Sequence, residues 1–126
     1  MVMLLRRDFL AGAVGAAFMR APTNRFGMLG KVIARPGQRD ALVKNLLAAA
    51  ELVGKAPGCE LYVVHTSPTE PDAVWVTEVW RSKEDHDGSL TVNGVKELIT
   101  KTRPLIAEMG EPTYTVPVGG KGLASI

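Results

Sequence analysis

Hydrophobic residues recur along the chain with two different spacings, and these spacings predict the elements of one domain. Short runs rich in β-branched and aromatic residues lie at 28–34, 59–66 and 73–80, with turn-forming Pro, Gly, Ser and Asp between them, as is typical of strands. From residue 38 to 53 the apolar positions follow the i, i+3, i+4 spacing of a helix with one buried face. The first two thirds of the domain therefore read strand, helix, strand, strand.

The C-terminal part repeats the helix and the strand. The spacing of Ser82–Asp85 is that of a capping box and predicts a short helical turn. A longer helix is predicted from about residue 93 to 109, with Pro104 bending its last turn. The run 114–118 predicts a last strand, and Pro117 within it favours an edge or a domain-crossing position.

The order β-α-β-β-α-β predicts a ferredoxin-like α+β fold. One sheet with both helices on one face leaves its other face bare. The runs 59–66 and 73–80 carry large apolar residues at alternating and intervening positions, so exposure of either face to water would be costly. We therefore expect a homodimer that closes the bare face, with Val116 and Pro117 placed to reach the partner.

The first 27 residues differ in character from the rest. Paired Arg6 and Arg7 precede an apolar run at 9–19, and the chain becomes polar at Arg20, which is the order of an export signal. The string RRDFL resembles the twin-arginine signal. We predict a leader over 1–27, a domain over 28–118 and a short tail over 119–126, with export to the periplasm or the exterior.

Two alternatives stand beside export. The run 9–19 could form a small helix that packs on the domain of a cytoplasmic protein, or translation could begin at Met28.

Length, charge and cysteine content exclude several classes of protein. The 126 residues suit one domain, and no stretch has membrane-spanning length. Residues 1–25 hold four Arg and one Asp, which leaves eleven basic and twelve acidic residues in 26–126. The domain therefore lacks the net positive charge that is typical of nucleic-acid-binding proteins. Cys59 is the only cysteine and the two His lie on different predicted elements, so we expect no disulfide, metal or other cofactor.

Several segments, all in order, resemble the antibiotic-biosynthesis-monooxygenase (ABM) domains and the related quinol monooxygenases. They are ARPGQRD (34–40), APGC (56–59), YVVHTSP (62–68), TEVWRSKED (77–85) and VKELITKTRPLI (95–106). The resemblance implies a dimeric α+β barrel that oxygenates phenols, anthrones or quinols with O2 and without a bound metal or flavin.

The sequence also departs from this family. Two histidines that members commonly carry before the last helix correspond to Ser89 and Gly94 here. The haem-degrading relatives use an Asn and a His at places that read about Gly30 and Ile99, so haem breakdown by their route is not expected.

Cofactor-free oxygenation needs a base, donors for the substrate anion and an apolar wall. His65 is our first candidate for the base because imidazole titrates near neutrality and the family often has His at this strand position. His86 is the second candidate. The plainer roles are a hydrogen-bonded strand end for His65 and a solvated helix start for His86.

Trp80 either stacks on an aromatic ligand or belongs to the core. Glu78 lies in an otherwise apolar strand; an ion pair with Lys31 or Arg103 is the favoured interpretation, and a polar pocket is the alternative.

Four further residues are candidates for binding. Tyr62 and Trp75 line either the cavity or the dimer face, because alternation cannot distinguish them. Ser89 and Asn93 could donate hydrogen bonds to a substrate oxygen, although turn and cap roles are common for both residue types.

These observations predict a cofactor-independent monooxygenase whose partners are a small aromatic substrate, O2 and a second copy of the chain. The main alternative is a non-catalytic aromatic-binding or dimerisation module of the same fold, and a haem-degrading relative is the less favoured one.

Overall fold

The computed structural model describes residues 24–123. The twin-arginine-like motif at Arg6 and Arg7 lies outside the described residues, so export stays a prediction. No described helix combines the length and the apolar content that a bilayer crossing requires.

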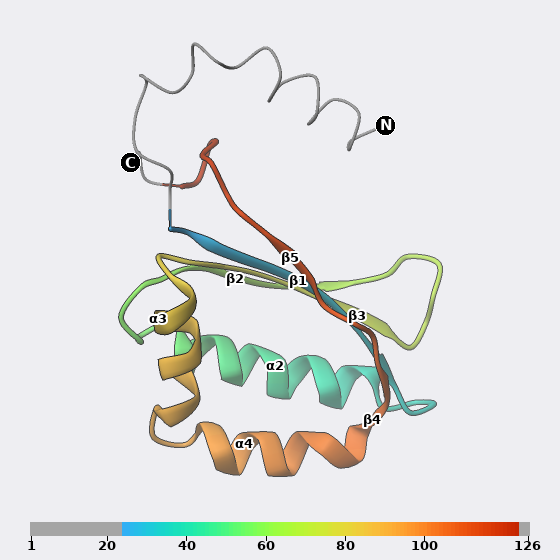
Figure 1. Ribbon diagram of the computed structural model, residues 1–126. Coiled ribbons are helices and arrows are strands. Elements are labelled where there is room, and N and C mark those ends of the chain that lie inside the picture. The colour runs from blue at the N-terminus through green and yellow to red at the C-terminus, as the bar shows by residue number, and fades with distance from the viewer. Residues whose placement is uncertain (1–23, 124–126) are drawn as a thin grey trace, which may run out of the picture.

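One antiparallel sheet forms the centre of the fold (Figure 1). Strand β1 (Phe26–Ala34) pairs with β3 (Ala73–Trp80), and β3 pairs with β2 (Cys59–Thr66). Strands β4 (Ile106–Met109) and β5 (Thr113–Thr115) both pair with β1, giving the order β2-β3-β1-β4. The predicted ferredoxin-like α+β fold is therefore confirmed; β2 and β3 match the predicted runs, and β1 begins two residues earlier than predicted.

The helices cover one side of this sheet (Figure 1). Helix α2 (Arg39–Val53) follows β1, and α4 (Val95–Thr102) follows the short α3 (Lys83–Gly88). The predicted cap of α3 forms, because the Asp85 N–H donates to Ser82 Oγ at 3.1 Å.

The last helix is shorter than predicted. It ends at Thr102, residues 103–105 form a 3-10 turn that contains Pro104, and the chain then enters β4. Proline has no N–H for the helix ladder and its ring clashes with the preceding turn, so the helical prediction to residue 109 was wrong. The predicted strand 114–118 was also too long, because β5 ends at Thr115.

Strand register assigns side chains to the two faces of the sheet. Met28, Glu78 and Tyr62 stand opposite one another on β1, β3 and β2, and all three line a hollow beneath the helices. The next row, Leu29, Thr77 and Val63, therefore faces the other way because strand side chains alternate.

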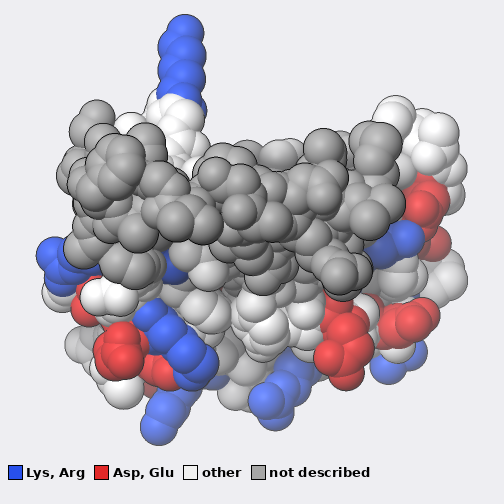
Figure 2. All heavy atoms as spheres, turned by 45° about the horizontal axis from the view of Figure 1, so that its top comes forward, with Lys and Arg blue, Asp and Glu red and all other residues white. Residues whose placement is uncertain are grey.

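The surface carries both signs of charge. Figure 2 shows basic and acidic side chains of the described residues interspersed around the visible rim, with no broad patch of one sign there.

Two apolar clusters hold the helices to the sheet. Leu42 and Val74 are fully buried and pack with Val32 and Ala34 at one end. The other cluster is built around the fully buried Trp80 together with Val53, Ala56 and Val95. The space between the clusters is not filled by side chains.

We predict that Leu42→Ala lowers the free energy of unfolding by about 2–5 kcal/mol, because it leaves a cavity in a closed core. Leu47→Ala is the matched control on the same helix: Leu47 is 51% exposed, and its truncation should cost about 0.5 kcal/mol or less. Denaturant unfolding measures both, and equal losses would contradict the assignment of the buried face.

Candidate functional site

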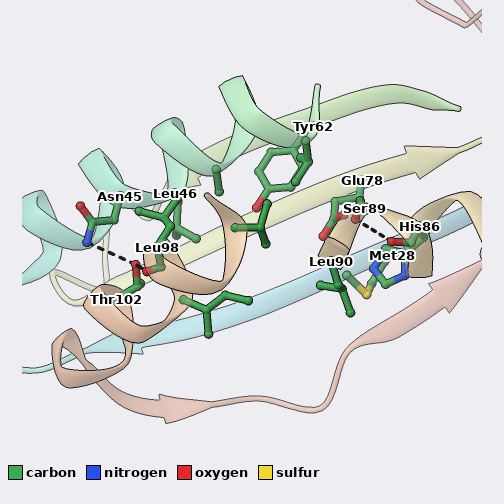
Figure 3. Close-up of a pocket in the computed structure, with 14 residues that line it drawn as sticks. Met28, Asn45, Leu46, Tyr62, Glu78, His86, Ser89, Leu90, Leu98 and Thr102 are labelled. Carbon is green, nitrogen blue, oxygen red and sulfur yellow. Dashed lines mark hydrogen bonds between the residues drawn. The ribbon is translucent and has the colours of Figure 1, made fainter. Parts of the chain in front are cut away.

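A cavity of about 250 Å³ lies between the sheet and the helices. Figure 3 shows its lining, which is mostly apolar, with polar groups at separate places. Ligand pockets commonly measure about 300–1,000 Å³, so this cavity suits one small molecule. The lining residues are Met28, Asn45, Leu46, Ala49, Val53, Tyr62, Glu78, His86, Ser89, Leu90, Val95, Leu98, Ile99 and Thr102.

Glu78 places a carboxylate in this cavity. It is only 8% exposed, and its Oε1 accepts a hydrogen bond of 2.9 Å from the Trp80 indole N–H. Burial raises the pKa of Glu78, while the Trp80 hydrogen bond and the nearby His86 act in the opposite direction. The carboxylate is therefore easier to protonate than an exposed one.

The ion pair favoured for Glu78 does not form. Lys31 instead bonds Glu70 at 2.7 Å and lies 5.5 Å from the Trp75 ring centre, and Arg103 is exposed. The prediction was wrong because Lys31 lies three positions from Met28, the residue opposite Glu78, and an odd offset sends the two side chains to opposite faces.

His86 reaches the same cavity from α3. Its ring lies 5.7 Å, edge-on, from Trp80 and 5.1 Å from Phe26, and its Nδ1 is 2.9 Å from Asp87 Oδ1. Hydrogen bonds from Lys83 and His86 lower the pKa of Asp87, which keeps this carboxylate ionised. An ionised acceptor at Nδ1 favours the tautomer that leaves the Nε2 lone pair available.

Tyr62 and Ser89 complete the polar part of the lining near His86. Burial, together with the charge of Glu78, raises the pKa of Tyr62 well above its usual range, so the phenol stays a neutral proton donor. The Ser89 hydroxyl donates to the His86 carbonyl at 2.6 Å. Its proton is thus engaged in the local backbone, and only its lone pairs face a ligand.

Three other candidates lie outside the cavity lining. Trp80 is fully buried behind Glu78, so it is a core residue that orients the carboxylate. His65 is exposed on the opposite face of the sheet, with Nε2 3.0 Å from Thr77 Oγ1. Asn93 is exposed in the loop before α4, beside a separate shallow hollow.

The structure adds a polar pair that we did not predict. Asn45 Nδ2 donates to Thr102 Oγ1 at 3.2 Å, and Thr102 donates in turn to the Leu98 carbonyl at 2.6 Å. Asn45 follows Leu42 by three residues and precedes Ala49 by four, which places it on the buried stripe of α2. A polar residue at a buried position of the helix was the feature of the sequence from which Asn45 could have been predicted to line the cavity.

A second hollow of about 250 Å³ adjoins the first and shares Met28, Leu46, Tyr62 and Glu78 with it. Gly30 lines this second hollow, and a Cβ built there would meet no atom within 4 Å. The space near Glu78 is thus larger than one cavity alone.

No group of three or more His, Cys, Asp or Glu side chains suited to a metal occurs within residues 24–123. The polar groups of the cavity are instead those of acid–base and hydrogen-bond chemistry.

Comparison with known proteins agrees with this geometry. Residues 25–100 match the family model for antibiotic biosynthesis monooxygenase. The chain belongs to the ABM family. A candidate antibiotic biosynthesis monooxygenase from Chloroflexus aurantiacus J-10-fl is 48% identical to this ABM protein, with a TM-score of 0.74 over 79% of this chain and 99% of that one.

More distant structures share the fold. A Caulobacter crescentus CB15 protein described in the same terms is 23% identical, with a TM-score of 0.67 over 77% of this chain and 92% of its own. A variant of SnoaB, a cofactor-independent oxygenase from Streptomyces nogalater, is 12% identical, with a TM-score of 0.68 over 79% and 98%. No curated protein matches this ABM sequence.

We predict that Glu78→Gln stabilises the ABM protein increasingly as pH rises. The folded-state pKa of Glu78 is raised, whereas a glutamate in an unfolded chain has a pKa of about 4.3. Between these two pKa values the free energy of unfolding of the wild type falls as pH rises, and that of the glutamine variant does not show this fall. Below that window the two proteins should respond alike to pH.

Denaturant unfolding from about pH 3.5 to about pH 8 covers this window, and the exposed Glu97→Gln is the matched control. A difference in stability that stays constant with pH, or that shrinks as pH rises, would contradict the assignment.

Proposed function

We propose that this ABM protein is a cofactor-independent monooxygenase that oxidises a small electron-rich aromatic compound, a quinol or an anthrone, with O2. The observation that supports this most directly is the pairing of two oriented groups on one apolar cavity: His86, held by Asp87, and Glu78, held by Trp80. The activity described for SnoaB, which has the same fold, adds support.

His86 is the base in this proposal. Its Nε2 takes the acidic proton of the bound substrate, from a phenol O–H or from the activated methylene of an anthrone. Glu78 lines the same cavity, and the charge of His86 acts on its carboxylate. Tyr62 donates a hydrogen bond to the oxygen on which the substrate's negative charge develops.

The substrate anion then supplies the electrons. For an anthrone-type substrate, the carbanion transfers one electron to O2, and the resulting carbon radical and superoxide combine into a peroxide anion through a new C–O bond. The proton held by His86 returns to give the hydroperoxide, and cleavage of its O–O bond with loss of water yields the ketone.

The reaction balances without a further reductant. One substrate methylene and one O2 become one carbonyl and one water, and His86 is regenerated. The methylene carbon is oxidised by four electrons, which O2 accepts. The apolar lining keeps bulk water from the anion during these steps.

The two histidines missing from their usual family positions do not leave the cavity without an imidazole. Ser89, at one of these positions, lines the cavity, and His86 lies three residues earlier and lines it as well. Residues three apart on a helical turn share a face, so His86 can replace the side chain that relatives carry at the later position. Gly94, at the other position, ends the loop before α4.

We expect metal-stripped protein to accelerate O2 uptake with anthrone or reduced naphthoquinone above the spontaneous rate. His86→Ala should lower kcat/KM about 100-fold or more, the usual contribution of a general base. His65→Ala is the matched control, because His65 lies on the other face of the sheet, and it should retain activity within about two-fold.

Absence of any rate above background across several such substrates would overturn the enzyme assignment. Saturable binding without turnover would then favour a non-catalytic binding module of the same fold.

We further propose that a second copy of the chain closes the open face of the sheet. Leu29 and Val63, 38% and 40% exposed, flank Thr77 in one row across three strands, and Trp75 lies on the same face of β3. Apolar side chains gathered on a bare face are costly in water, and a two-fold symmetric partner covers them with the same surface.

We expect a dimer mass in sedimentation equilibrium, and Val63→Glu should raise the dissociation constant about ten-fold or more, because the dimer would bury an unpaired charge. Leu47→Glu, an exposed apolar position on α2, should leave the mass unchanged. A monomeric wild type would contradict the proposed dimer.

A further inference from the structure

Among the described residues that line the cavity, Met28 is the one that carries a sulfur atom. It stands opposite Glu78 on the paired strand, and Figure 3 shows its side chain at the end of the cavity that holds His86 and Ser89. Phe26 shares this face of β1, and its ring centre lies 5.1 Å from that of His86. The thioether therefore lies at the end of the cavity where His86 would act on a ligand.

Met28 also lies where the two hollows adjoin. It lines both of them, as Glu78 and Tyr62 do, and it is half-buried. An oxidant dissolved in water reaches an exposed sulfur more readily than a half-buried one, whereas an oxidant bound in the cavity is held close to Met28. The place of the oxidant therefore decides whether this thioether reacts.

Met109 provides an internal comparison. It is 69% exposed and lines the second hollow but not the first. It pairs with Val32, four residues beyond Met28 on β1, which separates the two positions by about 13 Å along the strand direction. Residues 24–123 contain no other methionine, so the two thioethers distinguish an oxidant in the cavity from one in bulk water.

We propose that Met28 is a modification site, at which the thioether takes one oxygen atom from an aromatic hydroperoxide held in the cavity. During turnover this hydroperoxide is the intermediate of the reaction itself, and to that extent the inference rests on the proposed function. The choice of Met28 rests on the geometry of the cavity alone. A sulfoxide there places a polar oxygen on an apolar wall, so the modified protein should bind ligands more weakly and turn over more slowly.

The oxygen transfer balances without a further reactant. A lone pair of the sulfur attacks the terminal oxygen of the hydroperoxide, an S–O bond forms and the O–O bond breaks. The sulfur is oxidised by two electrons and the peroxide is reduced by two. The peroxide proton moves to the oxygen that stays on the ligand, so the ligand leaves as an alcohol. This transfer competes with the loss of water that gives the ketone.

The first experiment needs no turnover. The protein is treated with hydrogen peroxide or with cumene hydroperoxide, and peptide mass spectrometry gives the sulfoxide fraction at Met28 and at Met109. Hydrogen peroxide should oxidise the exposed Met109 first. Cumene hydroperoxide, a single-ring aromatic, should raise the ratio of Met28 to Met109 sulfoxide about ten-fold or more, because binding replaces chance encounter. Cumyl alcohol, the unreactive analogue, should protect Met28 and leave Met109 reactive.

A purely structural role for Met28 predicts a different result. A flexible thioether that only fills the gap between strand and helices would give the same ratio with both oxidants, and cumyl alcohol would not change it. Either of these observations overturns the inference. Both measurements use the wild type, so they do not depend on whether a variant folds.

The second experiment follows turnover with anthrone and O2, in the presence of catalase, which removes hydrogen peroxide from the bulk. Met28 should be oxidised before Met109, and the rate of O2 uptake should fall as the Met28 sulfoxide accumulates. Met28→Leu, a volume-conserving change, should keep a larger share of its own initial rate after the same number of turnovers. Met109→Leu is the matched control and should decay as the wild type does.

The two experiments separate this inference from the proposed function. Absence of O2 uptake, together with selective oxidation of Met28 by cumene hydroperoxide, would remove the monooxygenase and keep the modification site. Sustained O2 uptake with Met28 left unoxidised would keep the monooxygenase and overturn the inference.

Discussion

The hydrogen bond from the Trp80 indole to the Glu78 carboxylate is the contact on which the character of the cavity depends. A carboxylate that is only 8% exposed is costly unless a donor satisfies it. Because residues i and i+2 of a strand share a face, β3 supplies both the acid and its donor without help from another element. Trp80 is in turn fixed by the core cluster around Val53 and Val95, and its ring stands at 85° to the ring of His86.

Most of the fold could be predicted from the sequence because local signals agreed with one another. β2 and β3 have β-branched and aromatic residues between strong turn formers, and their bounds were predicted to the residue. The C-terminal region was harder, because Leu105, Ile106 and Met109 continue the apolar stripe of α4. These residues instead enter a turn and an edge strand, where pairing with β1 compensates for the end of the helix at Thr102.

The site was less predictable, because it depends on which face of the sheet each residue occupies. The sequence shows alternation but not register, and register separates Tyr62, in the cavity, from Trp75 and His65, on the open face. The same uncertainty produced the expected ion pair between Glu78 and Lys31. Asn45 was missed for a different reason: only the apolar residues of the helix were used to assign its buried face.

Gly30 leaves open space on the cavity face of β1. A side chain there would project into a hollow beside Glu78 without meeting other atoms, and the position is separate from the two clusters that hold the helices to the sheet. Gly30 itself is not a member of either cluster, although Val32 of the first cluster lines the same hollow. A side chain at position 30 would therefore reduce the volume of this hollow without displacing an atom of the buried core.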